Sequence, residues 1–105
     1  MLKEYIYVLK LIPRLHDEKN WTESEHEIVS QHFLRLKKYC EAGIVFTAGK
    51  TVDDKGFGIV IFSAVSEEEA TLFMKEDPAV KHGIMNAELF PYRTALVKSQ
   101  DSQRS

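Results

Sequence analysis

Apolar residues form four continuous runs along the chain, and each run predicts a β-strand. Residues 3–12 (KEYIYVLKLI) are rich in aromatic and β-branched side chains, which is typical of a buried strand. Residues 44–51 and 56–63 are also strand-like, and the four residues between them suit a hairpin loop. Residues 84–97 alternate loosely and contain Pro91, which is tolerated in an edge strand but not in a central one. The pattern therefore predicts four strands, the last of them at an edge of the sheet.

Two stretches between these runs show the spacing of an amphipathic helix. The first covers residues 22–42, begins at a Thr22–Glu25 capping box and ends at Gly43. Its predicted core face consists of Val29, Phe33, Leu36 and Cys40. The second covers residues 66–77 and is closed by the proline that follows. Its predicted core face consists of Ala70, Phe73, Met74 and Asp77.

The resulting order βαββαβ is that of a ferredoxin-like α+β fold, a four-stranded antiparallel sheet with two helices on one face. In residues 3–12 and 56–63 both alternating sets of side chains are apolar, whereas a sheet with one solvated face alternates apolar with polar. A second layer is therefore expected, since burying each large apolar side chain contributes roughly 1.5–3 kcal/mol. We predict that a second copy of the sheet supplies it, which makes the protein a homodimer. The alternative is that the C-terminal segment folds over this face.

The composition of the chain is that of one small globular domain. A length of 105 residues, 44% of them hydrophobic, suits a single core; residues 1–97 are predicted to form it, and residues 98–105 a polar, disordered tail. The 16 acidic and 14 basic side chains give a net charge of −2 without a basic block, so no polyanion partner is indicated. No apolar run approaches the ~20 residues that span a bilayer, so no membrane partner is expected. Cys40 cannot form an intrachain disulfide and is predicted to be buried, which favours a reducing, cytoplasmic setting.

One stretch imitates an RNA-binding motif. Residues 55–62 (KGFGIVIF) nearly reproduce the RNP1 sequence of RNA-recognition motifs, whose topology is the same. The stacking platform would consist of Tyr5, Tyr7 and Phe57. However, Ile59 stands where that family commonly stacks a base, and acidic residues flank the platform where phosphates would bind. Nucleic-acid binding is therefore disfavoured.

His32 and Asp77 are the strongest candidates for chemistry. His32 borders the predicted core face of its helix, and in two antiparallel helices an equal rise per residue puts Asp77 level with it. A carboxylate that accepts one ring N–H fixes the imidazole tautomer and raises the basicity of the other nitrogen, which makes a general base. Asp77 is predicted at the C-terminus of its helix, where the dipole disfavours an anion, so it needs such a partner. The alternative is an interhelical clamp without a substrate.

The other histidines indicate neither a metal site nor a cofactor. His26 and His32 are six residues apart and do not share the i, i+4 face of a metal-binding helix. His16, His26 and His82 are each predicted to be structural or solvated. The sequence contains no phosphate loop, nucleophile elbow or dinucleotide fingerprint, so no metal and no cofactor are expected.

Three segments of the chain resemble the YCII-related (YciI-like) proteins. They are residues 31–39 (QHFLRLKKY), residues 41–49 (EAGIVFTAG) and residues 76–80 (EDPAV) with Gly83, within a resemblance that spans residues 3–97. The resemblance implies a dimeric α+β barrel, related in fold to muconolactone isomerases and small cofactor-free monooxygenases. It also implies that His32 and Asp77 correspond to the His and Asp proposed as that family's active-site pair. The long loop from Pro13 to Trp21 departs from the shorter members and leaves the substrate open.

The resemblance favours a small-molecule enzyme, a cofactor-free isomerase or lyase acting on a cyclic or aromatic substrate. In this hypothesis His32, oriented by Asp77, moves the proton. Arg14 and Trp21 in the loop, with Arg93 on the last strand, are candidates to shape and charge the substrate pocket. The competing interpretations are a non-catalytic dimeric module that binds a small ligand, and a binder of single-stranded RNA.

Overall fold

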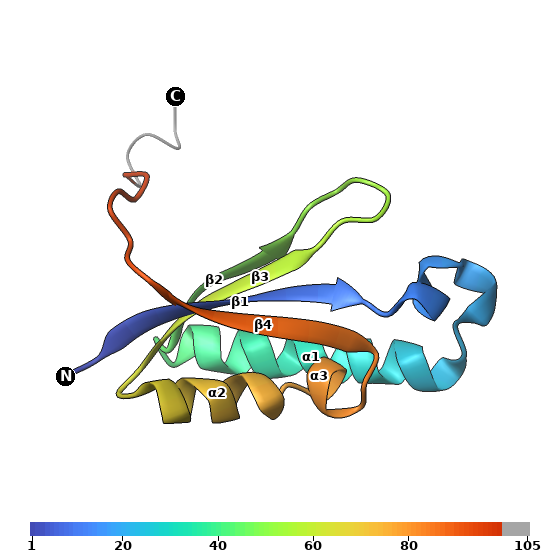
Figure 1. Ribbon diagram of the computed structural model, residues 1–105, viewed down its shortest axis with the longest axis horizontal. Coiled ribbons are helices and arrows are strands. Elements are labelled where there is room, and N and C mark those ends of the chain that lie inside the picture. Colours follow the sequence, from blue (N-terminus) through green and yellow to red (C-terminus); the bar gives the residue numbers. More distant parts are fainter. Residues whose placement is uncertain (100–105) are drawn as a thin grey trace.

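The computed structural model describes residues 1–99 and shows an antiparallel sheet with helices on one face (Figure 1). The sheet consists of β1 (Lys3–Leu11), β2 (Val45–Lys50), β3 (Gly58–Ala64) and β4 (Met85–Tyr92), in the order β2-β3-β1-β4. The helices are α1 (Glu23–Glu41), α2 (Glu67–Lys75) and α3 (Pro78–Lys81), and two 3-10 helices, η1 (Pro13–His16) and η2 (Glu18–Asn20), connect β1 to α1. The predicted ferredoxin-like α+β fold is confirmed, with α3 as an additional helix. Most of the predicted polar tail, residues 100–105, lies outside the described residues.

Local capping defines both ends of α1. The Glu25 carboxylate accepts hydrogen bonds from the Thr22 backbone N–H, at 2.7 Å, and from the Thr22 hydroxyl. The first of these pairs a donor that would otherwise be unsatisfied at the start of the helix. At the other end Gly43 has a φ of +82°, a left-handed conformation that glycine adopts without strain. The helix therefore starts and stops where the sequence predicts.

The face that α1 turns toward the core differs from the predicted one. Leu36 is buried, but Phe33 is 63% exposed and Cys40 is exposed as well, so the prediction of a buried Cys40 is wrong. The inward residues are Glu25, Ile28, Val29, His32, Arg35, Leu36 and Tyr39. Charged and titratable side chains occupy several of these inward positions. A prediction of the core face from apolar residues alone therefore rotates that face about the helix axis, away from its true position. His32 lies within the inward face and not at its border.

The second predicted helix is in fact two helices. α2 ends at Lys75 with Glu76 as its C-cap, and Pro78 begins α3 instead of closing α2. Proline suits the first turn of a helix because that position needs no backbone donor and its φ is already helical. Asp77 is consequently the N-cap of α3, not a C-terminal residue of α2. The predicted conflict between its charge and a helix dipole does not arise.

The main hydrophobic core lies between the helices and the sheet. Tyr5, Tyr7 and Leu9 of β1 face the helices and are each at most 4% exposed. Phe62 of β3 stacks on Phe73 of α2 with 4.6 Å between the ring centroids. Tyr5 and Tyr7 therefore do not belong to a platform on the open face. This placement removes two of the three rings that the RNA-binding interpretation requires.

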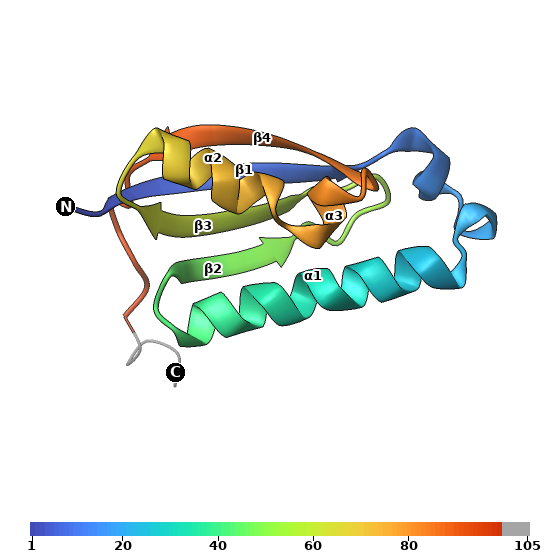
Figure 2. The same ribbon diagram turned by 90° about the horizontal axis from the view of Figure 1, so that it is seen from below.

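The opposite face of the sheet carries no helix within residues 1–99 (Figure 1). Strand register places Ile6, Val8, Ile59 and Ile61 at its centre, with Phe90 and Tyr92 of β4 beside them. Ile61 is only 6% exposed, whereas Phe90 and Tyr92 are 41% and 39% exposed. The chain after β4 leaves the sheet at its end (Figures 1 and 2), and Leu96 in that segment is 94% exposed. Residues up to 99 therefore do not provide the second layer.

Candidate active site

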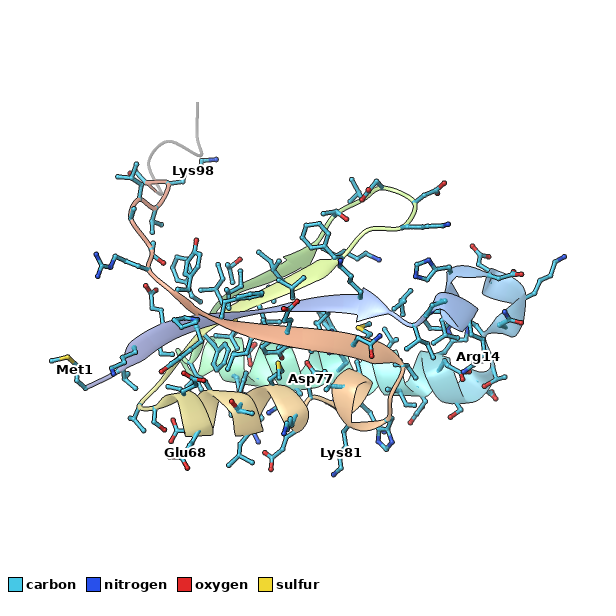
Figure 3. The ribbon with its side chains drawn as sticks, viewed as in Figure 1. Met1, Arg14, Glu68, Asp77, Lys81 and Lys98 are labelled. Atoms are coloured by element: carbon cyan, nitrogen blue, oxygen red, sulfur yellow. The ribbon has the colours of Figure 1, made fainter. Side chains whose placement is uncertain are left out.

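His32 of α1 and Asp77 of the α2–α3 junction lie in direct contact, and we call them the dyad. α3 packs beside α1 (Figure 2), which brings the two side chains together. His32 Nδ1 and Asp77 Oδ1 are 2.6 Å apart. Asp77 is fully buried, at 0% exposed, whereas the His32 side chain is 14% exposed. Figure 3 shows Asp77 where α2 meets α3, beneath the sheet. The contact expected from equal helix rise is present.

The Asp77 carboxylate receives two further hydrogen bonds. The backbone N–H of Ala79 donates to Oδ1 at 3.0 Å, and the hydroxyl of Tyr7 donates to Oδ2 at 2.7 Å. Burial is the largest influence on the carboxyl and would raise its pKa, but His32, Tyr7 and Ala79 together hold the pKa of Asp77 below its ordinary value. The aspartate is therefore an ionised group in a buried site.

Tyr7 also belongs to this site. The sequence analysis had assigned Tyr7 to the stacking platform of the RNA-binding interpretation. Burial first, and then the charge of Asp77, raises the pKa of Tyr7 well above its ordinary value. Its hydroxyl consequently remains a donor toward the carboxylate. The sequence does contain a signal for this role, because a buried tyrosine hydroxyl normally finds a partner and Tyr7 lies at the centre of a buried strand.

Apolar side chains surround the dyad on both sides. On α1 the histidine lies between Ile28 and Leu36, and along the chain the aspartate lies between Met74 and Ala79. These neighbours belong to two hydrophobic clusters, one under α2 and one under the start of α1. His32 and Asp77 therefore lie at the boundary between the two clusters. Electrostatic interactions in such a setting are stronger than at a surface, because less water screens them.

Arg35 is a second inward residue that the sequence analysis did not select. It lies three residues after His32, and its Nη2 donates to the carbonyl oxygen of Phe73 at 2.9 Å. Residues three apart on a helix share one face, so the position of His32 was itself a signal for Arg35. The guanidinium group links α1 to α2 close to the dyad.

Arg14 and Trp21 stabilise the loop that precedes α1. Arg14 forms a 3.0 Å ion pair with Glu25 and a 3.0 Å bond to the Asn20 carbonyl, and Trp21 Nε1 donates to the Leu15 carbonyl at 2.8 Å. Hydrogen bonds from Thr22, followed by the bond from Arg14, lower the pKa of Glu25 to about 2. Figure 3 shows Arg14 at the loop end of the molecule, away from Asp77. The structure thus gives both residues local partners.

Arg93 lies in another part of the surface. It lines an open hollow of about 660 Å³ together with the first five residues, Glu67, Pro91 and Tyr92. The hollow is at the end of the sheet where β4 leaves it, since Tyr92 pairs with Glu4 at the start of β1. Of the predicted site residues, the structure therefore brings together His32 and Asp77, and Arg14 and Arg93 lie elsewhere. Trp21 packs against the cluster of Leu15, Ala79 and Ile84, which borders the dyad.

Two other kinds of feature, a metal-binding cluster and a membrane span, are absent from the part of the chain that the structure describes. In residues 1–99 no group of three or more His, Cys, Asp and Glu side chains is arranged to hold a metal ion. No helix in that range is long and apolar enough to cross a membrane. His16 Nε2 lies 3.1 Å from the Leu11 carbonyl oxygen, an exposed local contact.

Comparisons with known proteins agree with this fold. A family model described as the YCII-related domain matches residues 9–93. No curated protein sequence matches the chain. Among solved structures, the fold is similar to that of a 5-chloro-2-hydroxyhydroquinone dehydrochlorinase from Burkholderia phenoliruptrix in complex with 2,5-dihydroxybenzoquinone, with a TM-score of 0.65 and 19% identity. That similarity covers 89% of this chain and 94% of the dehydrochlorinase chain.

Proposed function

The chain belongs to the YCII-related family, and we propose that it is a small-molecule enzyme in which His32, oriented by Asp77, acts as a general base. One observation supports this most strongly: a fully buried, ionised carboxylate contacts one ring nitrogen of a histidine that is itself partly exposed. Among residues 1–99, the other ring nitrogen, Nε2, has no hydrogen-bond partner. A histidine with one nitrogen fixed and the other free suits proton transfer.

The chemistry we assign to the site is removal of a proton by His32 Nε2 from a C–H or O–H group of the substrate. In an elimination, the electron pair of that bond forms a new double bond, and a leaving group departs with its own bonding pair. In an isomerisation, the protonated imidazole of His32 returns the proton to a different atom of the substrate. The ionised Asp77 stabilises the imidazolium that forms in either case. Both reactions balance without an oxidant or a reductant.

A hydroxylated ring is the substrate class we propose. The dehydrochlorinase of similar fold is named for a chlorinated hydroxyhydroquinone, and its complex holds a dihydroxybenzoquinone. The acidic hydroxyl group of such a ring is a suitable proton donor for a neutral imidazole. Because identity to that enzyme is 19%, only the reaction type and the ring class are carried to this chain.

Release of chloride from chlorinated hydroxyhydroquinones tests the proposal. We expect turnover by the unmodified protein, and a fall in kcat of about 10²- to 10⁴-fold in His32→Gln and in Asp77→Asn. His16→Gln, which changes an exposed ring at a local contact, is the matched control and should leave kcat unchanged. Full activity in His32→Gln would contradict the general-base role. Binding of the ring without turnover would favour the non-catalytic ligand-binding module.

We also propose that the open face of the sheet packs against a second copy of the chain. The support is the apolar centre of that face, formed by Ile6, Val8, Ile59 and Ile61, with the exposed rings of Phe90 and Tyr92 beside it. The double variant Ile59→Lys with Ile61→Lys should be a monomer or an aggregate and not a dimer, as measured by sedimentation velocity. Phe33→Lys adds a charge on the opposite layer, at a side chain that is 63% exposed, and should leave the dimer intact. A stable dimer of the double lysine variant would refute the interface.

The setting we propose for the protein is the cytoplasm. Cys40 is free and exposed on α1, and exposed thiols persist in reducing compartments. Formation of a disulfide-linked dimer through Cys40 during normal expression would contradict this assignment.

A further inference from the structure

The two oxygens of the Asp77 carboxylate are held from different parts of the fold. Oδ1 accepts from the backbone N–H of Ala79 at 3.0 Å and lies 2.6 Å from His32 Nδ1. Oδ2 accepts from the Tyr7 hydroxyl at 2.7 Å. The contacts at Oδ1 thus come from α1 and from the first turn of α3, whereas the contact at Oδ2 comes from β1. The carboxylate is fixed at both of its oxygens.

The bond at Oδ2 determines the orientation of the carboxylate plane. The terminal torsion of an aspartate, χ2, turns about an sp³–sp² bond and has broad energy minima. Contacts at Oδ1 alone would leave Oδ2 free to swing about that atom. A donor at Oδ2 from a separate element removes this freedom, so a lone pair of Oδ1 stays directed at the His32 ring.

Tyr7 is a rigid support for this bond. β1 is paired on both sides, and Val60 of β3 and Leu89 of β4 lie opposite Tyr7 in the sheet. The Tyr7 ring makes edge contacts with the rings of Phe62 and Phe73, with 5.6 Å and 6.4 Å between the centroids. A ring packed on several sides in a closely filled core is held in one rotamer. Its hydroxyl oxygen therefore has a fixed position relative to the helices.

Any influence of Tyr7 on a reaction passes through Asp77. Tyr7 is 0% exposed, whereas the His32 side chain is 14% exposed, so a substrate meets the histidine and not the phenol. Burial, followed by the charge of Asp77, raises the pKa of Tyr7 well above its ordinary value. The phenol therefore stays protonated and acts toward the carboxylate as a donor.

We propose that Tyr7 is a positioning residue whose hydroxyl sets the orientation of the Asp77 carboxylate, which in turn aims the His32 ring at the substrate. The inference rests on the proposed role of His32 as general base and adds the group that fixes its geometry. A displacement of about 1 Å at a reacting group can cost about 10²-fold in rate, because the reacting atoms must be aligned before proton transfer. Loss of the hydroxyl should therefore lower kcat.

The kinetics of chloride release from chlorinated hydroxyhydroquinones by Tyr7→Phe test this role. At a temperature where the variant is fully folded, we expect kcat to fall by about 10- to 100-fold with KM unchanged. Tyr5→Phe removes a hydroxyl from the same face of β1, at a ring that is 4% exposed and forms no hydrogen bond with Asp77, and should keep kcat. A purely structural role would lower the thermal midpoint and leave kcat of the folded variant intact. An unchanged kcat in folded Tyr7→Phe would overturn the inference.

The NMR signal of the proton between His32 Nδ1 and Asp77 Oδ1 tests the same role without turnover. A short hydrogen bond to a carboxylate moves such a signal downfield. In Tyr7→Phe the carboxylate can turn and the bond lengthens, so the signal should move upfield, whereas in Tyr5→Phe it should stay in place. This shift is a property of the folded state, and loss of stability does not change it. A signal that keeps its position in Tyr7→Phe, or moves further downfield, would overturn the inference.

A third measurement applies if Tyr7→Phe does not fold. The hydroxyl proton of Tyr7 in the unmodified protein should then give a sharp signal that is protected from exchange with water, and a freely exchanging hydroxyl would overturn the inference. Turnover separates this inference from the general-base proposal on which it rests. Full activity in His32→Gln would refute the general base whatever the result for Tyr7. Lost activity in His32→Gln, with unchanged kcat in Tyr7→Phe, would refute the role of Tyr7 alone.

Discussion

Replacing Tyr7 by phenylalanine removes one hydrogen bond from the dyad and leaves the ring in place. The hydroxyl donates to Asp77 Oδ2 at 2.7 Å, and Tyr7 is 0% exposed. A bond to a charged acceptor typically contributes about 1.5–3 kcal/mol. Tyr7→Phe should therefore lower the free energy of unfolding at pH 7 by about 2 kcal/mol, on the order of 10 °C in Tm for a domain of this size.

The same substitution has a pH signature. Burial alone would raise the pKa of Asp77. Its hydrogen bonds with His32, Tyr7 and Ala79 nevertheless hold that pKa below the ordinary value in the folded protein. A group with a lowered folded pKa stabilises the fold fully above its unfolded pKa, and this contribution is lost as the pH falls through the folded pKa. The stability deficit of Tyr7→Phe should accordingly be largest near neutral pH and shrink as the pH falls through the lowered folded pKa of Asp77.

Urea unfolding at pH 7 and at about pH 2, followed by circular dichroism, measures both effects. Tyr5→Phe is the matched control, because Tyr5 lies on the same strand and face and its hydroxyl forms no hydrogen bond within residues 1–99. Its free energy of unfolding should stay within about 0.5 kcal/mol of the unmodified protein. If Tyr7→Phe is as stable as Tyr5→Phe at pH 7, or if its deficit is the same at both pH values, the reasoning is refuted.

Two further predictions test the packing of α1 and its end. Leu36→Ala should cost about 2–5 kcal/mol in chemical unfolding because Leu36 is buried, whereas Phe33→Ala should change little because Phe33 is 63% exposed; equal costs would mean that the helix face is placed wrongly. Gly43→Ala should destabilise by about 1 kcal/mol, since a methyl group meets no atom there and only the φ of +82° opposes it. Gly49→Ala, equally open but without a positive φ, should not destabilise, and equal thermal shifts in the two variants would contradict the argument.

Local signals account for the parts of the fold that the sequence predicts well. The cap at Thr22 and the glycine at Gly43 act on the backbone next to them, so the ends of α1 follow from a few neighbouring residues. Helix rise predicts that Asp77 stands level with His32, but the observed contact also depends on the junction that makes Asp77 the N-cap of α3.

The parts that the sequence does not predict depend on tertiary contacts. The phenol of Tyr7 contributes to the site only because its strand packs under the junction that holds Asp77, and alternation along β1 does not say which face is covered. The inward face of α1 is hidden for a related reason, since His32 and Arg35 occupy positions where a purely structural helix would carry apolar residues. The short sequence at Pro78 is compatible with the end of one helix or the start of another, and only the packing of α3 decides.

The ¹⁵N spectrum of the His32 ring, recorded at neutral pH with and without 2,5-dihydroxybenzoquinone, tests the central claim most directly. The general-base account predicts a proton on Nδ1, held by Asp77, in both spectra, and a shift of the Nε2 signal when the acidic ligand binds. A ligand that binds without moving Nε2, or a ring that carries its proton on Nε2 while Nδ1 is bare, would show that the dyad is a clamp between helices and not a catalytic base.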